Sequence, residues 1–280
     1  MLFDAEMRAS AQRRLQTERE LRGAVERDEL ELRYQPIVNL RSGEVTGLEA
    51  LVRWRHSERG LLDPIDFVSI AEDGGLIEPI GRWVQERAAR QVLEWHELRP
   101  DARPLDVAIN LSARQVSHRD LPATIAEVIA RTGLDPVHLH LEITETVLVE
   151  ESAAAIATLE ALNELGVRLV LDDFGTGYSS LAYLNRFPFH ALKIDRSFVD
   201  TLGVEQEGTA IVEAVIGMAR ALSLEVIAEG VEKQIQLDEL VRLDCDYGQG
   251  HFFHEALRAE QISSLIEADA LDYSGISSTR

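Results

Sequence analysis

Residues 151–180, ESAAAIATLEALNELGVRLVLDDFGTGYSS, contain a helical pattern, a strand pattern and a polar loop in succession. Four apolar residues recur at the spacing of one helix face: Ile156, Leu159, Leu162 and Leu165. Gly166 is a typical helix stop, and the apolar run after it predicts a buried strand that ends at Asp172 and Asp173. Two adjacent carboxylates are costly to desolvate at the end of a buried strand, so this pair requires a compensating cation.

The same alternation of helix and strand extends along the chain. Further strand-like runs are expected at 105–112, 138–144, 190–195, 224–230 and 243–250, with helical patterns at 79–98, 121–133, 211–222 and 233–243. The β-rich runs 31–40 and 44–54, joined by Arg-Ser-Gly, predict a hairpin before them. Repeated alternation implies parallel strands with right-handed crossovers. The fold class is therefore α/β, and 280 residues suffice for one (β/α)8 barrel with an irregular hairpin at its start.

Composition restricts the class of partner. Hydrophobic residues make up 45% of the chain and charged residues 28%, which is typical of a soluble globular protein. The formal net charge of −21 argues against a nucleic-acid polymer or an anionic membrane as the main partner. The single cysteine, Cys245, cannot form an internal disulfide, and no signal peptide or long apolar segment is evident. We expect a cytoplasmic protein, or the cytoplasmic part of a larger signalling protein.

Polar residues stand at the ends of the predicted strands: Glu49, Asn110, Glu142, Asp172, Asp173, Lys193, Asp195, Glu229 and Gln249. In a parallel barrel these ends meet at one mouth. Carboxylate and amide oxygens, without cysteine or matching histidine, are the ligands of a hard divalent cation such as Mg²⁺ or Mn²⁺. A hydrogen-bonded strand end or a solvated loop charge would also explain any one of Glu49, Asn110, Glu142, Glu229 and Gln249, and a structural ion pair would explain Lys193. Asp172 and Asp173 are harder to explain in this way, because neighbours in a strand point to opposite sides unless the backbone turns there. The joint pattern favours a metal site.

Nine motifs in order resemble the EAL-domain phosphodiesterases, which hydrolyse the bacterial second messenger cyclic di-GMP. They are YQPIV, EALVRW, GLIEPIGRWV, INLS, LEITE, DDFGTGYSSLAYL, LKIDRSFV, IAEGVE and GQGHFF. The resemblance runs from about Leu30 to about Leu257. It implies a TIM-like barrel whose first strand is antiparallel, and metal-dependent hydrolysis of cyclic di-GMP to linear 5′-pGpG.

The resemblance also implies roles for individual residues. Two divalent cations, Mg²⁺ or Mn²⁺, would be held by Glu49, Asn110, Glu142, Asp172, Asp173 and Glu229. Lys193 would bind the attacking water or a phosphate oxygen, and Glu229 would act as a ligand or a general base. The implied catalytic set is Lys193, Glu229, Glu49 and Asp172. Substrate contacts are implied for Gln35, Arg53 and Gln249, and Glu145 would hold the DFGTGYSS loop.

Three features outside this set carry expectations of their own. Residues 1–28 resemble a linker helix that follows an upstream GGDEF domain, which leaves 29–268 as the barrel and 269–280 as a flexible tail. The family pattern implies a homodimer near the Asp173–Ser180 loop, through which a partner could move Asp173. The segment His251–Leu257 departs from the family pattern, which calls the shape of the substrate rim into question.

Two other functions remain open on the sequence. The chain could be a receptor that binds cyclic di-GMP without turnover, although such receptors usually lack some of the acids that are complete here. It could also be a different barrel enzyme, in which Lys193 forms a Schiff base with a carbonyl substrate. That chemistry does not require six convergent carboxylates and amides.

Overall fold

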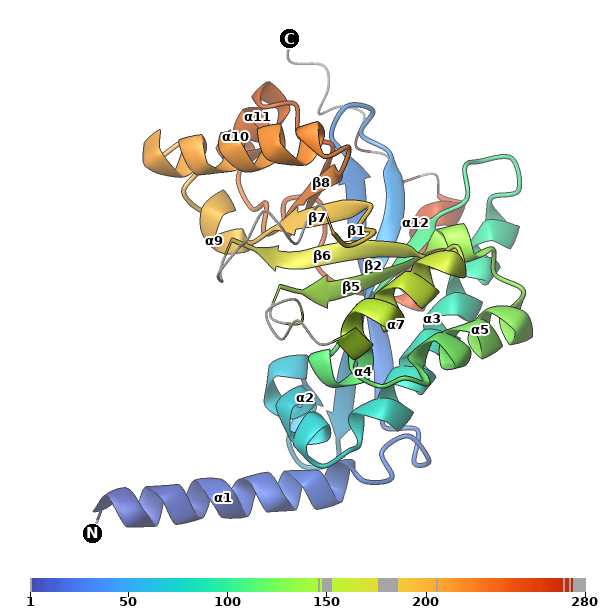
Figure 1. The fold of residues 1–280 in the computed structure, drawn as a ribbon, viewed down its shortest axis with the longest axis vertical. Helices are drawn as coiled ribbons and strands as arrows, with labels where there is room; N and C mark the ends of the chain where they lie inside the picture. Colours follow the sequence, from blue (N-terminus) through green and yellow to red (C-terminus); the bar gives the residue numbers. More distant parts are fainter. Residues whose placement is uncertain are drawn as a thin grey trace.

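The computed structural model describes residues 2–145, 147, 153–175, 186–204, 206–268, 270, 271 and 273. In this part of the chain eight strands close into a barrel (Figure 1): β1 (Leu30–Asn39), β2 (Val45–His56), β4 (Asp106–Leu111), β5 (Leu139–Thr144), β6 (Arg168–Phe174), β7 (Ala191–Ile194), β8 (Glu225–Ala228) and β9 (Tyr247–Gln249). Strand β1 is antiparallel to both of its neighbours, β2 and β9, and the other neighbours are parallel. The predicted barrel with an antiparallel first strand is thus confirmed.

Helices surround the barrel, and two short strands extend its sheet. The helices are α1 (Leu2–Leu21), α2 (Pro64–Asp73), α3 (Ile77–Leu98), α4 (Ala113–Val116), α5 (Leu121–Thr132), the 3-10 turn η1 (Pro136–His138), α7 (Ala153–Glu164), α9 (Arg196–Val199), α10 (Gln206–Ala221), α11 (Gln234–Arg242) and α12 (Ala259–Glu267). Strand β3 (Gly60–Leu62) pairs with β2, and β10 (Leu257–Arg258) pairs with β1.

Local sequence signals account for several of these boundaries. Helix α5 ends at Gly133, whose backbone takes the left-handed conformation with φ 80°. In α7 the predicted face is buried at Leu159 and Leu162. The turn between β1 and β2 forms because the side-chain oxygen of Asn39 accepts hydrogen bonds from the backbone amides of Arg41 and Ser42, at 3.0 and 2.9 Å.

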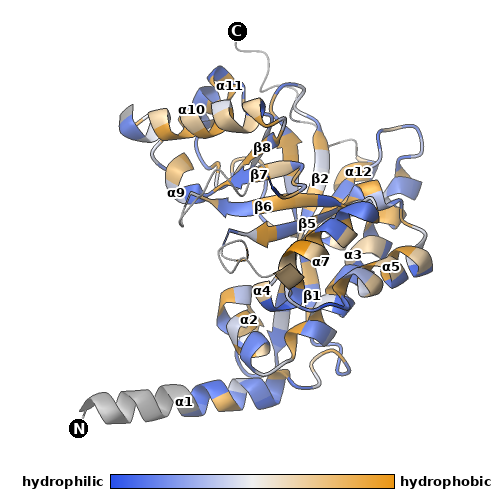
Figure 2. Cartoon of the chain, viewed as in Figure 1, coloured by the Kyte–Doolittle hydropathy of each residue, from blue (hydrophilic) through white to orange (hydrophobic). Residues whose placement is uncertain are grey.

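The barrel interior contains a small apolar layer. It consists of Ile37, Ala108, Val170, Ala191 and Ile227, with Tyr247 packed against them. These residues come from six different strands of the barrel. A much larger core lies between the strands and the surrounding helices, and Figure 2 shows the central strands as mostly hydrophobic. This interior layer forms the floor of the barrel mouth, and the polar residues of the mouth lie directly above it.

Helix α1 extends away from the barrel beside α2 (Figure 1). Its last turns are attached: Leu21 is buried, the guanidinium of Arg14 contacts Ser69 and Asp73 of α2, and Glu20 lies 3.0 Å from His56. No helix among the described residues combines the length and the apolar character needed to cross a membrane.

Two residues of the expected flexible tail contact the barrel. Leu271 is buried, and the Tyr273 hydroxyl donates a hydrogen bond to the carbonyl of Phe253 at 3.0 Å. Residues 274–280 lie outside the described part of the chain, as do residues 176–185, which include most of the Asp173–Ser180 loop.

Candidate active site

The predicted site residues form one inward-facing layer above the apolar floor. Side chains of a strand alternate between its two faces, so a residue two positions beyond an interior residue also points inward. Asn110 follows Ala108 in this way, Asp172 follows Val170, and Lys193 follows Ala191. The same step leads from Ile227 to Glu229, from Tyr247 to Gln249 and, on antiparallel β1, back from Ile37 to Gln35. The barrel therefore brings the predicted polar residues together at its mouth.

Lys193 lies at the centre of this layer with its side chain fully buried. Its Nζ contacts four carboxylates: Glu229 at 2.5 Å, Glu142 at 2.9 Å, Glu49 at 3.2 Å and Asp172 at 3.7 Å. One ammonium group cannot neutralise four carboxylates, so the mouth of the barrel retains excess negative charge. Such a site is expected to bind further cations.

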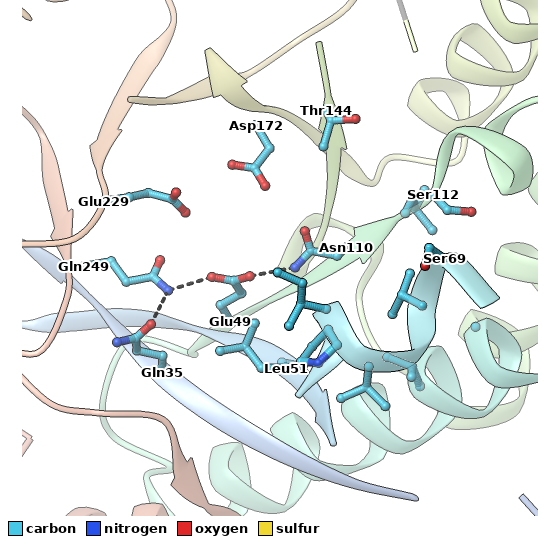
Figure 3. A pocket seen from close by; sticks show the side chains of 18 of the residues that line it. Gln35, Glu49, Leu51, Ser69, Asn110, Ser112, Thr144, Asp172, Glu229 and Gln249 are labelled. Atoms are coloured by element: carbon cyan, nitrogen blue, oxygen red, sulfur yellow. Dashed lines mark hydrogen bonds between the residues drawn. The ribbon is translucent and has the colours of Figure 1, made fainter. Parts of the chain in front are cut away.

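Glu49 is held by two amide side chains (Figure 3). Asn110 donates a hydrogen bond to its Oε1 and Gln249 donates one to its Oε2, each at 2.6 Å. Gln249 also donates to Gln35 at 3.0 Å, and Gln35 donates to the backbone carbonyl of His254 at 3.1 Å. The unusual segment His251–Leu257 therefore reaches the site through the main-chain carbonyl of His254.

The environment shifts the pKa values of these groups in opposite directions. Burial raises the pKa of Glu142 well above its ordinary value, and the neighbouring charge of Glu49 adds to the effect. Burial likewise raises the pKa of Glu229, to about 7. For Glu49 the effect of burial is outweighed by the charge of Lys193 and the two amide hydrogen bonds, so its pKa is lowered. Burial opposes the charge of Lys193, but the surrounding carboxylates raise its pKa well above the ordinary value.

A backbone irregularity places Asp173 beside Asp172. Consecutive residues of a regular strand point to opposite faces. Here the pairing of β6 with β7 shifts register between Leu171 and Phe174, and Asp173 has a φ of 54°, in the left-handed region. Its pKa is raised by burial and by the charge of Asp172. Carboxylate oxygens of Asp172, Asp173 and Glu229 consequently lie within 4.8 Å of one another.

Glu145 anchors the start of the loop that follows β6. Its Oε2 accepts a hydrogen bond from the backbone amide of Gly175 at 3.4 Å. Gly175 has a φ of 98°, and a Cβ at this position would lie 2.7 Å from Cε2 of Phe198. Glu145 and Phe198 thus hold the base of the loop from two sides, close to Asp173.

A cavity of about 980 Å³ opens over the acidic layer. Its lining includes Gln35, Glu49, Asn110, Asp172, Glu229 and Gln249. This volume lies within the usual range for a small-molecule site. The cavity leads from the buried charges to the protein surface, so a ligand can reach the carboxylates.

Arg53 does not lie with the other predicted residues. Its guanidinium is 2.8 Å from Asp63 and donates a hydrogen bond to the carbonyl of Val52 at 2.9 Å. Arg53 is also outside the set of residues that line the cavity. Arg53 could make its predicted contact with the substrate only if its guanidinium left Asp63.

The donor set fits divalent cations. Asp172, Asp173 and Glu229 offer oxygens close together, and the buried Oε1 of Glu142 has no hydrogen-bond partner among the residues that the structure describes. An orphaned carboxylate oxygen in a buried site is costly unless a cation or a water binds it. Hard oxygen ligands of this kind suit Mg²⁺ or Mn²⁺ better than zinc.

Part of the cavity wall was not predicted from the sequence. Ser69 and Glu72 of α2 line the cavity, as do Arg196 and Glu232 after β7 and β8. Arg196 and Glu232 lie within the motifs LKIDRSFV and IAEGVE. Arg196 directly follows Asp195, and Glu232 lies three residues after Glu229, so closeness to these strand-end polar residues was the sequence signal that could have identified both.

Known proteins are similar to this chain over almost its whole length. The EAL domain family model matches residues 18–256. The chain is 42% identical over 260 residues to the bifunctional diguanylate cyclase/cyclic di-GMP phosphodiesterase MucR of Pseudomonas aeruginosa, covering 93% of this chain and 38% of MucR. It is 43% identical over 270 residues to the cyclic di-GMP phosphodiesterase NbdA of the same organism, covering 96% of this chain and 34% of NbdA. The chain thus spans about a third of the length of these curated relatives.

Solved structures show the same architecture. The PaMucR phosphodiesterase in complex with c-di-GMP has a TM-score of 0.83 at 42% identity, covering 88% of this chain and 99% of that one. The EAL enzyme Bd1971 with cAMP and cyclic di-GMP bound has a TM-score of 0.87 at 35% identity, covering 92% of this chain and 70% of that one.

Proposed function

Because the chain belongs to the EAL domain family, we propose that it hydrolyses one phosphodiester bond of cyclic di-GMP to give linear 5′-pGpG. The observation that carries this proposal is the set of four carboxylates around the buried Nζ of Lys193, under an open cavity. A receptor needs a cavity to bind its ligand, but it does not need four carboxylates around a buried lysine, whose desolvation is costly. Relatives named as cyclic di-GMP phosphodiesterases at about 40% identity support the same substrate.

We assign the binding of two divalent cations, Mg²⁺ or Mn²⁺, to the acidic layer. The residues that would hold them are Glu49, Asn110, Glu142, Asp172, Asp173 and Glu229. Bound cations would supply Lewis acidity, which lowers the pKa of an attacking water and offsets the charge of the phosphodiester. They also solve an electrostatic problem, since an anionic dinucleotide would otherwise be repelled by a chain of net charge −21.

The protein's own side chains perform the remaining steps. Lys193 donates from Nζ to a phosphate oxygen or to the attacking water, and its burial keeps it fixed in that position. Glu229, with a pKa of about 7, can accept a proton near neutral pH. Gln249 and Gln35 hold Glu49 in place through the amide chain described above. Substrate contacts for Gln35, Gln249 and Arg53 belong to the same proposal.

The wider setting of the module is also part of the proposal. Residues 1–28 would link the barrel to an upstream GGDEF domain, as in a bifunctional cyclase and phosphodiesterase, and 269–280 would be a tail. The module would act in the cytoplasm and form a homodimer near the Asp173–Ser180 loop. If turnover per subunit is unchanged across a measured dimer-to-monomer transition, coupling between this loop and the site is wrong.

A comparison of binding with turnover distinguishes an enzyme from a receptor. Glu49→Ala removes a carboxylate that contacts Lys193 and accepts from Asn110 and Gln249. We expect the variant to retain affinity for cyclic di-GMP, measured by calorimetry in EDTA, within about threefold, and to lose product formation by at least about 100-fold. Equal product formation by the variant and the unmodified protein would refute the assigned role of this residue.

A further inference from the structure

Helix α3 contains a glycine, Gly81, in its second turn. A glycine inside a helix is unfavourable relative to alanine, because it loses more backbone freedom on folding. The backbone of Gly81 does not have a positive φ, so its conformation does not require glycine. A Cβ at this position would overlap Nε2 of Gln115 and lie 3.1 Å from its Cδ. The glycine therefore makes room for the side chain of Gln115 against α3.

Gln115 lies in α4, shortly after β4, and its side chain is buried. Its Oε1 accepts a hydrogen bond from the backbone amide of Ser112 at 3.1 Å, and its own backbone amide donates to Oγ of Ser112 at 3.3 Å. This reciprocal pair is a capping box, which satisfies two backbone amides that the helix itself leaves without an acceptor. Gln115 thus connects α3 to the turn by which the chain leaves β4.

That turn follows a residue of the candidate site. Asn110 lies two residues before Ser112 and points toward Glu49, to whose Oε1 it donates a hydrogen bond at 2.6 Å (Figure 3). Asn110 also pairs in register with Glu142 of the neighbouring strand β5. Movement of the turn would therefore shift the amide of Asn110 relative to both carboxylates.

Gln115 also borders two cavities. It lines the cavity of the candidate active site together with Gly81, and it lines a second cavity of about 370 Å³ together with Gln85 and His118. The side chain of Gln115 therefore has space to move into when its position beside Gly81 is blocked. Substitution of Gly81 is expected to displace Gln115 without unfolding the protein.

We propose that Gln115 is a positioning residue for the metal-binding layer and that Gly81 is required because it lets this side chain reach Ser112; the inference rests on the proposed function. Gln115 acts through the turn after β4 and not by contact with the metal or the reacting atoms. When Oε1 of Gln115 is removed, the backbone amide of Ser112 loses its acceptor, and the end of β4 is no longer held in one position. Asn110 then holds Glu49 less precisely, and the site binds divalent cations more weakly.

The first test measures binding of Mn²⁺ by calorimetry in the absence of substrate. We expect Kd for Mn²⁺ to rise at least about tenfold in Gln115→Ala and in Gly81→Ala, because loss of a group that supports a metal ligand typically weakens metal binding by this amount. Gln115→Glu keeps an oxygen that accepts from the amide of Ser112, so its Kd should stay within about threefold of the unmodified value. Equal losses in Gln115→Glu and Gln115→Ala, or no loss in Gln115→Ala, would overturn the proposal.

Two matched controls separate this role from general effects of the substitutions. Oε1 of Gln261 accepts from the backbone amide of Arg258 at 2.9 Å at the start of α12, and Gln261 is not among the described residues that line the cavity. Gly217 lies inside α10, and a Cβ there would meet no atom of the described residues within 4 Å. Gln261→Ala and Gly217→Ala should leave Kd for Mn²⁺ unchanged, and losses equal to those of the test variants would contradict a specific role for Gln115.

A double variant tests whether Gly81 acts through Gln115. Gln115→Ala removes the atoms that a methyl group on residue 81 would meet, so Gly81→Ala should cause no further loss of Mn²⁺ affinity in its presence. If the fold-losses of the two single variants multiply instead, Gly81 acts independently of Gln115 and the proposed link is wrong.

Kinetics at saturating Mn²⁺ give the second readout. Gln115→Ala should lower kcat about tenfold and leave KM within about threefold, because the residue orients the metal-binding layer and does not bind substrate. A raised KM with unchanged kcat would make Gln115 a part of the cavity wall alone and would refute its positioning role. The two proposals fail separately: Mn²⁺ affinity is measured without substrate, so it decides the role of Gln115 even if the unmodified protein does not hydrolyse cyclic di-GMP.

Discussion

At the scale of single residues, Lys193 sets the electrostatics of the site. It is one of only two lysines in the chain, and its Nζ contacts four carboxylates in a buried position. Removing one partner of a buried charge network leaves the others uncompensated, and this costs more than the network itself contributes. Its electrostatic role should therefore be visible in stability as well as in catalysis.

Lys193→Met is expected to lower the free energy of unfolding of the metal-free protein by about 3 kcal/mol at pH 7, as measured by urea denaturation. Saturating Mg²⁺ should restore more stability to this variant than to the unmodified protein, because the cation replaces the missing charge. Lys233→Met is the control, since Lys233 is exposed and its loss should change stability by less than about 0.5 kcal/mol. Equal stability of both variants would contradict a compensating role for Lys193.

Glu229 gives the site a pH dependence. Its pKa is about 7 in the folded protein against 4.5 for the free side chain, so between these values the folded state binds more protons than the unfolded state. Stability of the metal-free protein due to this group therefore falls as pH rises from about 4.5 to 7, by an amount on the order of 3 kcal/mol. In Glu229→Gln the free energy of unfolding, measured by denaturation at a series of pH values, should not fall over this pH range. If both proteins show the same slope, Glu229 titrates normally.

At the scale of elements, the end of β6 connects the fold to the site. Asp173 takes a positive φ, and two residues later Gly175 packs against Phe198 and donates to Glu145. The strand end is thus held in one conformation by contacts from Glu145, directly after β5, and from Phe198 of α9. Any change that shifts Gly175 should move the Asp173 carboxylate.

Gly175→Ala places a methyl group 2.7 Å from the ring of Phe198. We expect this variant to bind Mn²⁺ at least about tenfold more weakly in a calorimetric titration, because Asp173 is displaced from its neighbours. Gly60→Ala is a matched control: the φ of Gly60 is also positive, at 75°, but a Cβ there would meet no atom of the described residues within 4 Å. The control should lose about 1 kcal/mol of stability and keep its metal affinity. Normal metal affinity in Gly175→Ala would show that the position of Gly175 does not affect metal binding by Asp173.

Sequence patterns predict most of this architecture, because strand alternation and polar strand ends are local signals. Asn110, Asp172 and Lys193 are inward-facing at predictable positions, two residues beyond the small or apolar interior residues of their strands. The bulge at Asp173 could not be predicted from the sequence, because a single residue with positive φ gives no signal in the amino-acid composition. Arg53 could not be placed either, because its contact with Asp63 depends on how β2 meets the start of α2.

At the scale of the whole molecule, an acidic chain is proposed to bind and cleave an acidic ligand. The net charge of −21 repels a cyclic dinucleotide, and Arg196 is the only lysine or arginine among the described residues that line the cavity. Divalent cations resolve this conflict, so their removal should affect turnover far more than it affects the fold.

The most direct test is product analysis with and without metal. Purified protein is incubated with cyclic di-GMP in Mg²⁺, in Mn²⁺ and in EDTA, and the nucleotides are separated by chromatography. We predict linear 5′-pGpG with at least one of the two metals and none in EDTA. Binding of cyclic di-GMP with no linear product under either metal would contradict the hydrolase and identify a receptor.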